Sequence, residues 1–308
     1  MIRFFEKRYV YFTISALIIL AGIIGMFVNG VQLDIQFKGG AILKYQYTGT
    51  LDAEQAGDFV SQKLGGRLVQ AQETQDLATK NTYLVLNLAG EYGLDAAEKQ
   101  ALDEALQVEF PEASLSEAGS SMVEPFFGHR FLQRGMIAIG LSAILIVLYV
   151  WYSFRKISGL SAGVMALVAL FHDLLVVFFV CVLFKIPIGE SFVAVALTIL
   201  GYSINDTIVI YDRIRENARL YKDMPVETLV NKSINQSLTR SINTNLAVCL
   251  SVALVYGFAF ANGIDSIKSF ALPMAIGAVS GSYSTICIAG PLWAMWKRHQ
   301  RDKHARTA

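Results

Sequence analysis

The chain has 308 residues, of which 54% are hydrophobic and 17% charged, and its formal net charge is +1. Soluble domains contain about 45–50% apolar residues even with glycine included, so this composition argues against a wholly soluble protein. The small net charge says little by itself, because the charged residues are sorted by position along the chain.

The apolar residues are concentrated in six blocks with few or no charges. A helix needs about 20 such residues to cross roughly 30 Å of hydrocarbon. The first block is longer than the apolar core of a signal peptide and no clear small-residue cleavage site follows it, so we expect a retained anchor. We expect membrane-spanning helices over Tyr9–Val28, Met136–Tyr152, Ser161–Phe184, Phe192–Tyr211, Thr244–Ala261 and Phe270–Trp296.

Basic residues indicate which way these helices cross the membrane. Clusters of Lys and Arg precede the first block, follow the last, and lie between blocks two and three and between blocks four and five. The other two short loops carry only Lys185 and Lys268. Because short basic loops stay in the cytoplasm, both termini are expected to be cytoplasmic and residues 31–130 to lie on the opposite side.

Residues 31–130 have the size and pattern of one small folded domain, with 15 Asp and Glu against 7 Lys and Arg. Val31–Tyr47 is expected to form two strands joined at Gly39 and Gly40. The predicted order β-β-α-β-β-α-β contains the arrangement of a ferredoxin-like α+β domain. Its later elements are expected at Leu51–Leu64 and Leu94–Phe110 as helices, and at Arg67–Gln72, Thr82–Leu88 and Ser114–Val123 as strands.

These expectations divide the chain into four parts. Residues 1–30 are the cytoplasmic N-terminus and first membrane helix, and residues 31–130 are the extracytoplasmic α+β domain. Residues 131–296 form a region of five membrane helices, and residues 297–308 are a basic cytoplasmic tail.

The fourth block contains a carboxyl group inside the expected membrane region. Thr198, Tyr202 and Asp206 are spaced four residues apart, with Asn205 beside them, on an otherwise apolar helix. Asp206 is six residues before the charged residue Asp212, about 9 Å along a helix at roughly 1.5 Å per residue. A polar stripe at this depth must face protein or water. Asp206 is either a hydrogen-bonding residue between two helices or a group that binds and releases a proton during transport.

A candidate partner for Asp206 stands at the start of the fifth block. Arg240, Asn243 and Thr244 share one helical face. If the fourth and fifth helices are antiparallel neighbours, Arg240 lies near the depth of Asp206 and its movement would change how tightly the carboxyl group holds a proton. The alternative is that Arg240 only anchors the helix by reaching to the lipid headgroups.

His172 and Asp173 lie in the middle of the third block. Adjacent residues point about 100° apart on a helix and lack the spacing of a ligand set, so we expect no metal here and assign Asp173 to packing or to a proton relay. No phosphate-binding loop or dinucleotide fingerprint is present, so no cofactor is expected and any driving energy must come from an ion gradient or a partner. No defensible set of catalytic residues is present, so we do not expect an enzyme.

Four segments together resemble the SecD/SecF family, and within it the SecF type of subunit. They are Leu33–Gly40, Val123–Pro125, His172–Asp173 and Gly201–Asn217, and the resemblance covers nearly the whole chain in order. The Gly201–Asn217 segment is highly specific for the family. Two departures are mild: Gln36 stands where the family often has a shorter run, and Glu124 replaces a common glycine.

The resemblance implies an accessory role in protein export. The family belongs to the resistance-nodulation-division superfamily, sits in the bacterial inner membrane, and uses the proton motive force to help pull preproteins out of the SecYEG translocon. Its SecF subunits work with SecD as a separate or fused chain, so SecD, SecYEG, preproteins and membrane lipid are the implied partners, and nucleic acid is not. The family's essential aspartate and conserved arginine match Asp206 and Arg240.

Two other functions remain open from the residues. A half-transporter of the same superfamily could export lipid or small molecules, although such exporters usually carry both halves and a second large loop in one chain. A passive assembly factor without ion coupling is the other alternative. It would keep its activity when Asp206 is replaced by asparagine.

Overall fold

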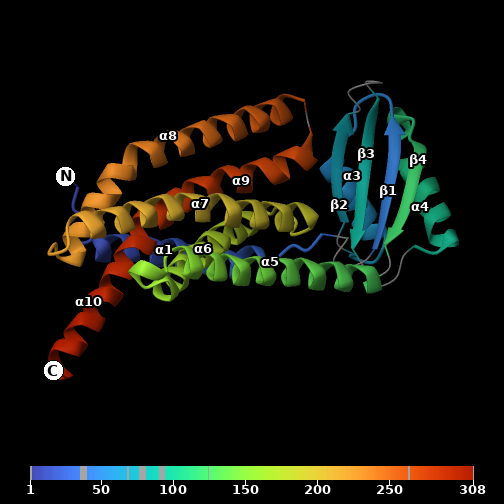
Figure 1. Cartoon of the computed structure of the whole chain (residues 1–308). Helices are drawn as coiled ribbons and strands as arrows, with labels where there is room; N and C mark the ends of the chain where they lie inside the picture. The colour runs from blue at the N-terminus through green and yellow to red at the C-terminus, as the bar shows by residue number, and fades with distance from the viewer. Residues whose placement is uncertain are drawn as a thin grey trace.

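The computed structural model describes residues 2–34, 40–67, 69–75, 81–89, 94–123, 125–262 and 264–307. A bundle of long helices makes up most of the molecule, and a small domain with a β-sheet stands at one end of it (Figure 1). Both chain termini lie at the opposite end of the bundle (Figure 1).

Six helical segments of the described chain are long and apolar enough to cross a membrane, in agreement with the six predicted blocks. These segments are Arg8–Asn29, Gln133–Ser153, Gly159–Leu183, Glu190–Leu220, Val226–Ala261 and Ser266–Lys303. The corresponding helices are α1 (Arg8–Asn29), α5 (Pro125–Ser153), α6 (Gly159–Leu183), α7 (Glu190–Leu220), α8 (Val226–Ala261), α9 (Asp265–Ser284) and α10 (Gly290–Thr307). A π-helical turn, Thr285–Ala289, joins α9 to α10.

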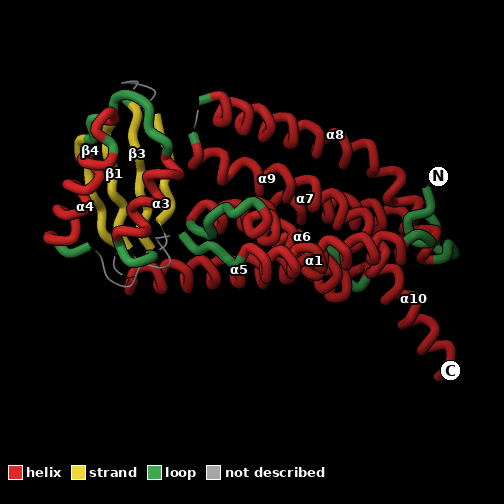
Figure 2. Tube along the Cα trace, turned by 180° about the vertical axis from the view of Figure 1, so that it is seen from behind, coloured by secondary structure: helices red, strands yellow, loops and turns green. Residues whose placement is uncertain are grey.

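Helices α6, α7 and α9 form the centre of the bundle. Their close approach depends on small residues: a side chain at Gly277 of α9 would come within 2.8 Å of Ile199 and of Val177. Helices α8 and α5 run along opposite sides, as both views show (Figures 1 and 2). Only 11% of the span of each is buried, against 61% for α6, so their apolar outer faces require lipid or another protein.

The small domain is a four-stranded antiparallel sheet with the order β2-β3-β1-β4 and two helices on one face (Figure 2). Along β1, Leu43, Tyr45 and Tyr47 are buried beneath the helices with Val60 and Leu106, as the two-residue period of a half-buried strand requires. Asp52 caps α3 by accepting hydrogen bonds from two backbone N–H groups. The elements are β1 (Gly40–Tyr47), α3 (Ala53–Lys63), β2 (Val69–Gln75), β3 (Thr82–Ala89), α4 (Ala96–Glu109) and β4 (Ser116–Val123).

The start of this domain differs from the sequence prediction. Among the described residues of Val31–Tyr47, only β1 is a strand of the sheet. Leu33 instead forms a parallel bridge with Ile188, between α6 and α7, and so ties the end of α1 to the bundle. The predicted turn at Gly39 lies outside the described residues. So do Gln36 and Glu124, the two departures from the family pattern.

Candidate functional site

Asp206 lies at the contact between α7 and α8, where it is only 9% exposed. The hydroxyl of Ser241, on α8, donates a hydrogen bond of 2.5 Å to its Oδ1 atom. Asp206 and Ser241 are each well inside their candidate spans, Glu190–Leu220 and Val226–Ala261. The carboxyl group therefore lies at a depth that both helices cross. An ionisable group at such a position is costly and usually functional.

Three buried polar atoms near this contact have no hydrogen-bond partner among the described residues: Tyr202 Oη, Asp206 Oδ2 and Asn245 Oδ1. Tyr202 lies one turn from Asp206 on α7 and packs near Cys249 of α8, while the amide of Asn245 donates to the Ser241 carbonyl at 3.2 Å. We call Tyr202, Asp206, Ser241 and Asn245 the α7–α8 seam. Buried polar groups without partners are unfavourable, so the seam can take up a proton or water.

Arg240 is the residue before Ser241 but forms no ion pair with Asp206. Its side chain is exposed, and no nitrogen–oxygen distance of 4.0 Å or less joins it to Asp206. Arg240 adjoins Ser241 in the chain, so it lies next to the seam. In this structure Ser241 holds Asp206 and Arg240 stands at the edge of the seam.

The other predicted polar residues do not converge on Asp206. Thr198 and Asn205 are exposed on the outer face of α7, and the Thr198 hydroxyl donates to the Ala194 carbonyl of its own helix at 2.7 Å. Asn243 and Thr244 are exposed on α8. The predicted stripe therefore divides: Tyr202 and Asp206 turn inward, and Thr198 turns outward.

Asp173 organises a second polar cluster at the centre of the bundle, where it is completely buried. Serine hydroxyls donate to it at 2.7 Å: Ser280 to Oδ1, and Ser203 and Ser284 to Oδ2. The ring of His172 lies 3.3 Å from Oδ1. The cluster joins α6, α7 and α9, so one carboxyl group fixes three helices.

The same helix, α7, carries both clusters. Ser203 and Thr207 contact the centre of the bundle, and Thr207 shares a 2.8 Å hydrogen bond with Thr285, the first residue of the π-helical turn. Asp206, between them in sequence, contacts α8. Turns of π-helix are frequent at functional sites, and this one lies beside the Asp173 cluster. A shift of α7 would therefore alter both clusters.

The serines that hold these carboxyl groups were not predicted from the sequence. A signal existed for one of them, because Ser237, Ser241 and Asn245 recur every four residues on an apolar helix and are all buried. No sequence pattern marks the other three serines, Ser203, Ser280 and Ser284, because they contact Asp173 only through the packing of three helices. The described residues contain no group of three or more His, Cys, Asp or Glu that could hold a metal ion.

The chain is similar to known protein export membrane proteins. The family model for the C-terminal region of the protein export membrane proteins SecD and SecF matches residues 105–299. The translocase subunit SecF of Thermobaculum terrenum is 32% identical over 305 residues, which cover 96% of this chain and 94% of that protein. The SecDF subunit of Brucella abortus is also 32% identical, but this chain spans only 39% of its length. The crystal structure of SecDF from Thermus thermophilus, a translocon-associated membrane protein, superimposes with a TM-score of 0.77 at 27% identity, over 96% of this chain and 39% of that one.

Proposed function

We propose that this chain, which belongs to the SecD/SecF family of protein export membrane proteins, is the half of a SecD–SecF complex that couples proton flow to protein export. The relatives support a multi-pass membrane protein with a role in export. The observation that carries the ion coupling is Asp206, a buried carboxyl group with one oxygen held by Ser241 and the other unpartnered among the described residues.

The chemistry of the seam differs between the two states of Asp206. A neutral carboxyl has an O–H that can donate to an acceptor such as Asn245 Oδ1, whereas a carboxylate can only accept and attracts the cation of Arg240. Each state therefore favours a different fit of α8 against α7. Moving one proton across 100 mV provides about 2.3 kcal/mol, enough to change the ratio of two conformations roughly 50-fold.

We further propose that a homologous SecD chain covers the outer faces of α7 and α8. Thr198, Asn205, Asn243 and Thr244 are exposed there within candidate spans, where polar side chains need protein or water as neighbours. The SecDF relative, more than twice as long as this chain, supports such a partner in the same assembly. SecYEG and exported preproteins are the further partners proposed.

The basic clusters support an orientation in the bacterial inner membrane with both termini in the cytoplasm. The sheet domain at the other end of the bundle would then be extracytoplasmic (Figure 1). A cysteine in place of exposed Lys63 is expected to react with an impermeant thiol reagent in intact cells, whereas one in place of Arg219 should react only after lysis. The opposite pattern would overturn this orientation.

We propose that the extracytoplasmic domain, residues 31–130, is ferredoxin-like and moves with the membrane helices. The element order β-α-β-β-α-β and the sheet order β2-β3-β1-β4 support this fold. The four-part division of the chain predicted above is proposed on the same grounds. Because the domain continues directly into α5, a rearrangement of the bundle would rotate the domain. The rotated domain would then hold an exported chain.

The deciding experiment measures preprotein export into inverted membrane vesicles with and without a proton gradient. Asp206→Asn keeps the shape but removes the ionisable group, so the variant should insert normally and lose stimulation by the gradient. Asp212→Asn is the matched control, because it makes the same change at an exposed position of the same helix. Wild-type stimulation of Asp206→Asn would leave Asp206 as a structural residue and favour a passive assembly role.

A further inference from the structure

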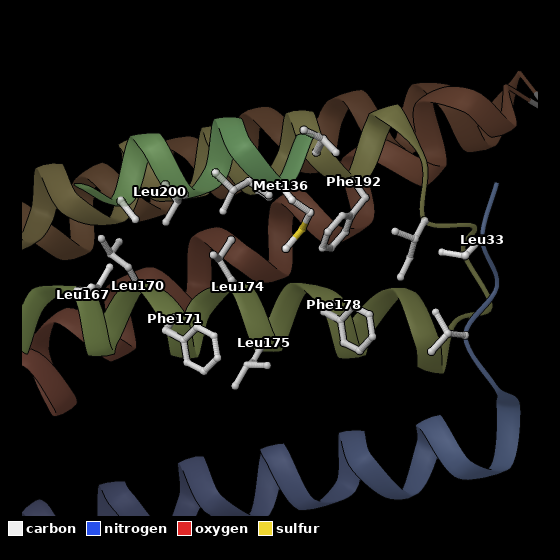
Figure 3. Close-up of a pocket in the computed structure, with 17 residues that line it drawn as sticks. Leu33, Met136, Leu167, Leu170, Phe171, Leu174, Leu175, Phe178, Phe192 and Leu200 are labelled. Atoms are coloured by element: carbon white, nitrogen blue, oxygen red, sulfur yellow. The ribbon is translucent and has the colours of Figure 1, made fainter. Parts of the chain in front are cut away.

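An apolar cavity of about 460 Å³ lies between α5, α6 and α7, away from both polar clusters. Figure 3 shows Leu174 and Phe178 of α6 and Phe192 of α7 directed into it. Leu33 and Ile188, which form the parallel bridge, close the end nearest the sheet domain. All the residues that line it are apolar.

The cavity lies between two close approaches of α5 to its neighbours. A side chain at Gly135 would come within 3.0 Å of Val193 on α7, and one at Gly163 of α6 would come within 3.2 Å of the backbone of Val147 on α5. Between these contacts the helices leave a gap. Gly140 lines it, and a side chain there would meet no atom within 4 Å.

The cavity opens onto the outer surface of the bundle. Met136 and Phe171 line it and are each 61% exposed, so its mouth is on the side of the spans that a bilayer surrounds with acyl chains. Apolar cavities exclude water, because a water molecule needs two to four polar partners. Lipid tails are the apolar material at this position.

The close approaches that bound the cavity restrict its occupant. A helix with its side chains is about 10–12 Å wide. Because α5 closely approaches α7 at Gly135 and α6 at Gly163, a helix of a partner or of a preprotein cannot pass between them without moving α5. A single extended hydrocarbon chain is narrow enough to enter along its length.

We propose that this cavity binds one acyl chain of a membrane phospholipid, with the headgroup at the end near the sheet domain. Arg134, Lys185 and Glu190 are exposed at that end, so a headgroup would meet two cations and one carboxylate. The same end contains both connections to the domain, through Leu33 and through α5. The bound chain thus fills the space under α5 and braces the helix that carries the domain.

The test uses the full chain in vesicles of phosphatidylethanolamine and phosphatidylglycerol containing a phospholipid with a photoreactive diazirine in its acyl chain. After irradiation, adducts are mapped by mass spectrometry of peptides. Peptides containing Ala143, Leu174 and Ala196 should be labelled several-fold more than the exposed α8 peptide around Leu250 and Leu254. Equal labelling of the two regions would overturn the proposal without any mutation.

Gly140→Phe places a ring in the cavity and should reduce the labelling of its walls several-fold. Gly257→Phe is the matched control, because Gly257 is also an exposed glycine of a candidate span with no atom within 4 Å of its missing side chain. Labelling of the cavity walls that survives Gly140→Phe unchanged would show that no lipid chain occupies the cavity.

Discussion

Ser241, and not the neighbouring Arg240, holds Asp206 across the α7–α8 contact through a 2.5 Å hydrogen bond. The proposed proton site is therefore closed by a short neutral side chain, while the cation stands outside it. This arrangement corresponds to a state in which Asp206 and Arg240 are apart. A conformation with an Asp206–Arg240 ion pair requires α8 to rotate or slide, and the Ser241 bond would break as it does so.

Replacing Ser241 by alanine removes this bond. The change should weaken the coupling between protonation of Asp206 and the fit of α8 against α7. Hydrogen bonds between membrane helices contribute about 0.6–1.7 kcal/mol, so the gradient-stimulated export rate should change about three- to twentyfold. Ser241→Thr keeps the hydroxyl and should restore most of the wild-type rate. Equal rates for the alanine and threonine variants would show that the hydroxyl is unimportant. The measurement is export into inverted vesicles at fixed gradient.

Tyr45 is expected to make the stability of the sheet domain fall at alkaline pH. Burial, together with its 2.5 Å hydrogen bond to Asp103, raises the pKa of Tyr45 above its usual value near 10. The neutral phenol is thus favoured by folding, so its stabilisation is complete below about pH 10 and is lost as pH rises toward the folded pKa.

Thermal unfolding of the domain within the full chain, measured from neutral pH to above pH 10, should show this loss of stability. Tyr45→Phe should lower stability at neutral pH by about 1.5–3 kcal/mol, the contribution of a hydrogen bond to a charged group, and should flatten the decline above pH 10. Tyr83→Phe is the control, because Tyr83 is only partly buried and contacts Lys44. An unchanged alkaline decline in Tyr45→Phe would assign the effect to other groups.

The predictable parts of this molecule are those set by composition along one helix. Asp206 was identified because its charge interrupts an apolar block, and hydropathy alone located the six spans. The partner of Asp206 depends on the rotation of α8 about its axis. Successive residues differ by about 100° on a helix, so the rotation of α8 about its axis decides whether Arg240 or Ser241 faces α7. The cluster around Asp173 needs three helices at once, which no single segment specifies.

Asp173 is predicted to stabilise the centre of the bundle. Asp173→Ala removes three serine hydrogen bonds, at about 0.6–1.7 kcal/mol each in membranes, and should lower the free energy of unfolding by roughly 2–5 kcal/mol. Unfolding in mixed micelles measures this change. Combining it with Ser280→Ala should add little, because the bond is already lost, whereas the distant Ser251→Ala, on exposed α8, should be additive. An Asp173→Ala variant as stable as the wild type would exclude this role.

Arg240 is predicted to act through its charge and only in the gradient-driven part of export. Arg240→Gln should abolish stimulation by the proton gradient while export without a gradient continues, since the arginine makes no ion pair with Asp206 that the fold would lose. Arg240→Lys keeps a cation and should keep part of the stimulation. Lys232→Gln is the control, because Lys232 is on the same helix but stacks 3.5 Å from the ring of Tyr221, away from the seam. If Arg240→Gln and Lys232→Gln retain equal stimulation, Arg240 is a membrane anchor and has no part in proton coupling.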